Sequence, residues 1–234
     1  MWNPRPLSAT LLAVLLTFAL LPSQALAQED WKLHKDTEGI QLYTREVPGQ
    51  VLKNFRGVMQ IDAPLRQVAA MLADVPAMPE WFFMLKESRF IKGEHVDDSY
   101  VYLAMKGIWP VSPRDVIVHV KVRQDPVTLT IHADVESEEG ILPRQEGFVR
   151  LPSMRAKWRL TPVNPQHTEV EISGSADPGG MIPLAIANFA VTVLPEQTLK
   201  KMRVHLARPE YKDLKIIYAK NPKLRELAER MTFP

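Results

Sequence analysis

The apolar residues between positions 40 and 61 alternate with polar ones, which is typical of strands that bury one face. Phe55, Met59 and Ile61 all lie at odd-numbered positions, which fall on one face of an extended strand. They predict a strand over residues 51–61. Ile40 and Leu42 predict its partner strand, before a turn at residues 48–50. The period then becomes helical over residues 63–74, and residues 79–84 predict a second short helical turn that is rich in aromatic side chains.

Two later hairpins show the same alternation. In the first, residues 115–123 and 127–136 each carry an apolar row, and the register that joins these rows places His119 opposite His132. In the second, residues 154–160 pair with residues 170–176, which places Arg159 opposite Glu171 on the polar face. Both hairpins indicate an antiparallel sheet with one apolar face and one face in water.

The last third of the chain changes to a helical period. Residues 182–207 predict a long helix, which would span roughly 39 Å. Its first half carries no charge, but Pro183, Asn188 and Pro195 favour a bent core helix over a membrane span. Residues 209–234 carry a charged helical pattern and predict a peripheral tail.

The element order predicts an α+β helix-grip fold. Two strands, a helix, a short helix and about six antiparallel strands precede the long helix. In a helix-grip fold a curved antiparallel sheet wraps around the long C-terminal helix, with short helices between the early strands. The periodicity leaves open whether the apolar concavity packs solid or encloses a tunnel.

Composition and the N-terminus narrow the class of protein. The chain has 234 residues, 29 basic against 27 acidic residues, and no cysteine, which excludes disulfides, thiol nucleophiles and Cys-ligated metals. Residues 1–27 predict a cleavable signal peptide, because Arg5 precedes an uncharged run that ends in Ala25-Leu26-Ala27. We therefore expect a periplasmic or secreted protein with a ligand-holding domain over residues 28–208 and the tail over residues 209–234. The balanced charge offers no basic block for nucleic acid.

Arg114 is the single residue with the most specific prediction for ligand binding. Arg114 lies an even number of residues from the apolar row Val116, Val118 and Val120, so its side chain is expected on the same inward face. The side chain of Asp115 is expected on the opposite face. An unpaired guanidinium in an apolar interior costs several kcal/mol, so it must find an anion. Two partners stay open: an internal Asp or Glu, or the phosphate or carboxylate head group of a ligand.

Several segments resemble one family, the START (steroidogenic-acute-regulatory-protein-related) lipid-transfer family in its bacterial form. The resemblance covers about residues 31–208 and rests on residues 109–115 (W-P-V-S-P-R-D), Val149-Arg150, residues 158–162 (W-R-L-T-P), residues 177–183 (D-P-G-G-M-I-P) and Asn188. It implies a cavity for a lipid or other hydrophobic small molecule, with the Arg of the motif at the polar end. The signal peptide and the tail depart from the family pattern. The candidate ligand-binding residues are Arg114, Trp81, Trp109, Val118, Val120, Ile131, Ala133, Trp158, Met181, Ile182, Asn188 and Phe189.

The signals for catalysis are weak. The six histidines are scattered, and the sequence contains no H-E-x-x-H or G-x-S-x-G motif, so we predict no metal, no cofactor and no enzyme activity. Two alternatives to a carrier stay open: a helix-grip enzyme of the cyclase or hydrolase type, and a periplasmic adaptor without a small ligand. We expect a monomer that touches membrane surfaces transiently through apolar loop tips at residues 107–113, 139–147 and 177–183.

Overall fold

The computed structural model describes residues 31–50 and 52–234, so the predicted signal peptide and Val51 lie outside the described residues. Residues 31–234 form one compact unit. Its elements are β1 (Lys32–Thr37), β2 (Ile40–Arg45), β3 (Asn54–Ile61), α1 (Leu65–Ala73), the 3-10 turn η1 (Val75–Ala77), α2 (Met78–Trp81), β4 (Leu85–His95), β5 (Asp98–Met105), β6 (Arg114–Gln124), β7 (Ile131–Ser137), β8 (Val149–Arg150), β9 (Ser153–Asn164), β10 (His167–Asp177), α3 (Leu184–Leu206), α4 (Pro209–Lys212), α5 (Leu214–Lys220) and α6 (Pro222–Glu229).

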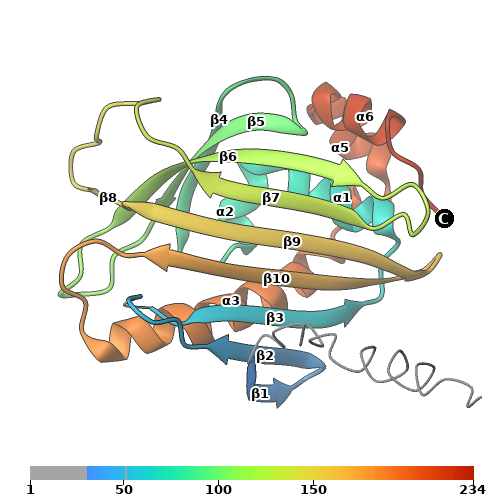
Figure 1. Cartoon of the computed structure of the whole chain (residues 1–234). Coiled ribbons are helices and arrows are strands. Elements are labelled where there is room, and N and C mark those ends of the chain that lie inside the picture. The colour runs from blue at the N-terminus through green and yellow to red at the C-terminus, as the bar shows by residue number, and fades with distance from the viewer. Residues whose placement is uncertain (1–30, 51) are drawn as a thin grey trace, which may run out of the picture. The chain divides into compact units, whose positions relative to one another are not determined.

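The strands form a single ten-stranded sheet with the order β1-β2-β3-β10-β9-β7-β6-β5-β4, and its neighbours pair antiparallel (Figure 1). The short β8 lies off this path and pairs parallel with the start of β6. Together with α3 this confirms the predicted helix-grip fold. The edge strand β1 was not predicted, because its sequence K-L-H-K-D-T is mostly exposed and shows no apolar alternation.

The register predicted for the β6–β7 hairpin is wrong. Val120 pairs with Val135, and His119 pairs with Glu136, so His119 and His132 are not cross-strand neighbours. The connection is longer than predicted because the Asp125 carboxylate accepts hydrogen bonds from the backbone of Val127 and Thr128. The shift is an even number of residues, so each side chain still lies on its predicted face.

The β9–β10 hairpin has the predicted register. Ile172 lies opposite Trp158 on the inner face, and Glu171 lies opposite Arg159 on the outer face. The Arg159 guanidinium donates to Glu171 at 2.8 Å. The two neighbouring charges support this register on the face that water reaches.

The long helix α3 runs across one face of the sheet (Figure 1). It has 23 residues, with Pro195 inside it. Glu196, which follows this proline, is buried and pairs with Lys35 of β1 at 2.9 Å and with Lys200 at 3.1 Å. The Lys35–Glu196 pair holds the C-terminal half of α3 against the β1–β2 edge of the sheet.

The C-terminal segment is helical, but it is not peripheral, so that prediction is wrong. Tyr211, Ile217, Leu224 and Leu227 are buried in the main hydrophobic core, together with residues of α1 and the sheet. The segment is charged along one side only, and its other side packs. None of the helices within residues 31–50 and 52–234 is long and apolar enough to span a bilayer.

Candidate ligand-binding site

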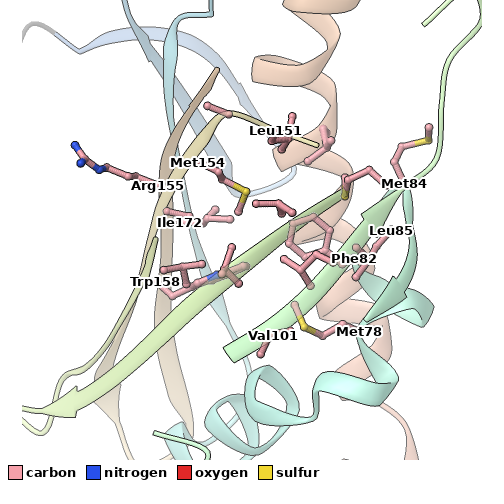
Figure 2. Close-up of a pocket in the computed structure, with 18 of the residues that line it drawn as sticks. Met78, Phe82, Met84, Leu85, Val101, Leu151, Met154, Arg155, Trp158 and Ile172 are labelled. Carbon is pink, nitrogen blue, oxygen red and sulfur yellow. The ribbon is translucent and has the colours of Figure 1, made fainter. Parts of the chain in front are cut away.

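The inner face of the sheet does not pack solid against the helices. A cavity of about 310 Å³ lies between the inner faces of β5, β6, β7, β9 and β10, the α1–α2 segment and α3. This volume is at the low end of the range of about 300 to 1,000 Å³ for ligand pockets. Figure 2 shows Met154 and Trp158 of β9 directed into the same space as Phe82, which follows α2. The interior therefore has room for a small hydrophobic molecule.

Most of the residues predicted to bind a ligand do line this cavity. The alternation on β6 and β7 brings Val118, Val120, Ile131 and Ala133 to the inner face, as the parity of the sequence predicts. The other members of the predicted set that line the cavity are Arg114, Trp158, Ile182 and Phe189. Their role in binding stays a prediction.

Four of the predicted residues, Trp81, Trp109, Met181 and Asn188, do not line the cavity. Trp81 is fully buried behind the wall, where its ring packs against Phe82 and edge-on against Trp158. Asn188 is exposed, because it lies about 100° around α3 from its buried neighbour Ala187. Trp109 and Met181 lie on loops next to the cavity, but their side chains are 91% and 99% exposed.

Other wall residues were not predicted. Met78 comes from the α2 turn, and Leu227 and Met231 come from the C-terminal segment. Leu224, Leu227 and Met231 follow helical spacing, which indicates an apolar face and could have suggested packing. Sequence spacing alone does not show which surface such a face covers.

Arg114 faces the cavity, as predicted, and has no acidic partner within the part of the chain that the structure describes. It lines the cavity at the start of β6, and its Nη1 donates to the backbone oxygen of Ser112. Its Nε is buried without a hydrogen-bond partner among the described residues. No carboxylate of residues 31–50 or 52–234 lies within 4.0 Å of the guanidinium. Burial lowers the pKa of Arg114, which is the expected effect on a cation that has lost water.

The charged residues among the described wall residues are all basic: Lys53, Lys106, Arg114 and Arg155. Lys53 pairs with Glu46 and Arg155 pairs with Glu136, and Figure 2 shows the Arg155 side chain directed away from the pocket. Lys106 directly follows Met105, the cross-strand partner of Arg114, so both cations lie at the same end. This end of an otherwise apolar cavity therefore favours a negatively charged group.

The outer face of the sheet behind Arg114 carries a buried ion pair. Arg150 donates from Nε and Nη2 to the two carboxylate oxygens of Asp115, each at 2.9 Å, and the side chains are 8% and 1% exposed. Burial and the charge of Asp115 raise the pKa of the neighbouring Tyr102 to about 12. Asp115 is thus neutralised on the outer face and does not pair with Arg114.

The three loops predicted to form an apolar rim do not behave alike. Ile108, Val111 and Ile182 of the first and third loops line the cavity. Ile141 and Leu142 of the second loop instead pack on the outer face of the sheet, against Tyr102 and Ile117. The prediction that residues 139–147 join the rim is therefore wrong, because Arg150 also donates to the carbonyl oxygens of Leu142 and Pro143 and holds this loop to the outer face.

An antiparallel sheet that grips a long helix around an apolar cavity with a cationic end defines a helix-grip domain for a hydrophobic ligand. Comparison with known proteins gives the family: the START domain model matches residues 17–210. The chain belongs to the START family, whose fold serves the binding or transfer of hydrophobic ligands.

Individual relatives agree with this assignment. An uncharacterised protein of Pseudomonas aeruginosa is 33% identical over 175 residues, which cover 75% of this chain and 86% of that protein. The crystal structure of a STAR-related lipid transfer protein from Xanthomonas axonopodis is 35% identical, with a TM-score of 0.70 over 76% of this chain and 99% of the other. Human STARD10 shares the fold alone, at 18% identity and a TM-score of 0.73, over 86% of this chain and 82% of its own.

Proposed function

We propose that this protein binds, and carries between membranes of the cell envelope, an amphipathic lipid with one hydrophobic tail and an anionic head group. The single observation that supports the head group is Arg114, a partly buried cation without a carboxylate partner among the described residues. A phosphate or carboxylate oxygen would accept from its buried Nε and would offset the cost of removing the charge from water.

The size and chemistry of the cavity support a single tail. Its wall is built from Val, Ile, Leu, Met, Ala and Phe side chains, which attract a hydrocarbon without directing it through hydrogen bonds. A volume of about 310 Å³ suits one acyl chain or a similarly slim hydrocarbon. A diacyl phospholipid would need the walls to move apart.

The proposed exchange with membranes rests on the loops beside the cationic end. Trp109, Met181 and Leu184 are exposed to 91%, 99% and 76%, and their loops or helix ends also contribute Ile108 and Ile182 to the cavity wall. Apolar side chains next to basic ones suit the surface of an anionic bilayer. Envelope location rests on the predicted signal peptide, with cleavage before Gln28.

Native mass spectrometry of the protein purified from a periplasmic fraction tests the proposal. We expect a mature chain that begins at Gln28 and carries one noncovalently bound acidic lipid, which organic extraction then identifies. A protein that keeps no lipid, and that binds neither fatty acids nor lysophospholipids when these are added, would contradict the carrier function.

A further inference from the structure

The end of the cavity opposite Arg114 is closed by the C-terminal segment. Leu227 of α6 and Met231, just after it, line the cavity together with Val122 and Ile131. Val122 lies eight residues after Arg114 on the same strand, so about 26 Å separate the two ends at the rise of an extended strand. In Figure 1, α6 lies near the β6–β7 turn, at the end of the sheet away from β8.

This closing element lies beyond the segment that the START domain model matches. The START domain match ends at residue 210, and α5 and α6 lie entirely beyond it.

Polar contacts hold the closing element in place from several sides. Arg230 pairs with Asp97 at 2.8 Å, beside the β4–β5 turn. Gln124 at the end of β6 donates to the Thr232 carbonyl oxygen at 2.7 Å and accepts from the Thr232 backbone N–H at 2.9 Å. The Arg66 guanidinium of α1 lies over the Phe233 ring. Met231 lies between these anchors, so its position in the cavity wall is set on both sides.

We infer that the C-terminal segment sets the length of the hydrophobic tail that the cavity accepts, with Leu227 and Met231 as the stop. This inference rests on the proposed carrier function and on a head group held near Arg114. Each methylene that enters the apolar cavity raises affinity about fourfold while room lasts. A longer tail would meet Leu227 and Met231, and affinity would then fall because the packed end resists overfilling.

The test measures the affinities of straight-chain saturated carboxylates from octanoate to docosanoate, and of the matching primary alcohols, for the full mature chain. We expect the wild type to prefer one chain length. Met231→Ala moves the optimum to longer chains and Met231→Trp moves it to shorter chains, in both the acid and the alcohol series. Ile216→Ala, on the partly exposed side of α5 and outside the cavity wall, leaves the optimum unchanged.

The outcomes separate the inference from the function on which it rests. If the wild type binds acids or alcohols but the optimum is the same in both Met231 variants, the length-setting role is wrong and the carrier function stands. If the wild type binds neither series and no lysophospholipid, the carrier function is wrong and the inference falls with it. Because Met231 is only partly buried, both variants should fold, and thermal unfolding verifies this.

Discussion

Arg114 and Asp115 are adjacent in the chain, but their side chains lie on opposite faces of β6 in opposite electrostatic situations. Asp115 is almost fully buried on the outer face and holds two hydrogen bonds from Arg150. Arg114 faces the cavity and has no carboxylate within 4.0 Å among the described residues. The alternation of the strand thus separates two charges that would otherwise neutralise each other, and it leaves Arg114 without a carboxylate partner among the described residues.

Arg114→Leu should weaken the binding of anionic amphiphiles about ten- to a hundredfold, the equivalent of one charge-assisted hydrogen bond. Neutral amphiphiles of the same tail length should lose little, because the apolar wall is unchanged. Titration calorimetry with a fatty acid and the matching alcohol measures both. Arg123→Leu, on the outer face of the same strand, is the control, and an equal loss for both ligands would argue against a head-group role for Arg114.

Val120→Trp should block ligand uptake, because Val120 lies in the cavity wall and an indole fills much of a volume of about 310 Å³. Lys121→Trp is the matched control, since Lys121 is the next residue of β6 and is exposed on the other face. Displacement of a fluorescent fatty acid measures uptake, and circular dichroism verifies the fold. Normal uptake by a folded Val120→Trp protein would place the ligand elsewhere.

Arg150→Ala should destabilise the protein by about 3 to 5 kcal/mol, because it leaves the buried Asp115 carboxylate without its partner. The Arg155–Glu136 pair is exposed, so Arg155→Ala should cost less than about 1 kcal/mol. Urea denaturation compares the two free energies of unfolding. Similar costs for both variants would mean that water still reaches the Asp115 carboxylate.

Trp109→Ser and Met181→Ser should each reduce the binding of the protein to vesicles that contain anionic lipids, because they remove apolar side chains beside the cationic end of the cavity. Val127→Ser is the control: Val127 is 88% exposed, but it lies in the β6–β7 turn at the other end of the strand. Vesicle co-sedimentation gives the bound fraction. If Val127→Ser lowers binding as much as the other two, membrane contact has no preferred end.

His205 should make the protein less stable as the pH falls below about 6.5, the ordinary value for histidine. Burial, with Arg208 nearby, lowers the pKa of His205 in the folded protein, so the unfolded chain binds the proton more tightly. Protonation therefore favours unfolding, and the stability that neutral His205 maintains is present above that pH.

Thermal unfolding across this pH range measures the effect. His205→Gln should flatten the profile between about pH 7.5 and pH 5.5, whereas the exposed His95→Gln should not. A profile that is equally steep in the His205 variant would assign the acid sensitivity to other groups.

The alternation of apolar residues was enough to determine which face is buried in the strands of the β6–β7 and β9–β10 hairpins. Val118, Val120, Ile131 and Ala133 reach the cavity wall even though the β6–β7 register differs from the predicted one. The alternation of side chains between the two faces is a local property of an extended strand. A change of strand register by an even number of residues leaves each side chain on the same face. The inward direction of Arg114 follows from the same rule, and the fold class follows from the order of the elements.

The strand register, the ion-pair partners and the docking of the C-terminal segment were determined only by the tertiary structure. The β6–β7 register depends on how Asp125 shapes the turn, and the partner of Asp115 comes from Arg150, thirty-five residues away in the chain. The docking of Leu227 and Met231 at the end of the cavity depends on complementary surfaces from α1 and the sheet. Periodicity shows that a face is apolar, but only the packed three-dimensional arrangement determines which surface covers it and whether a cavity is left between them.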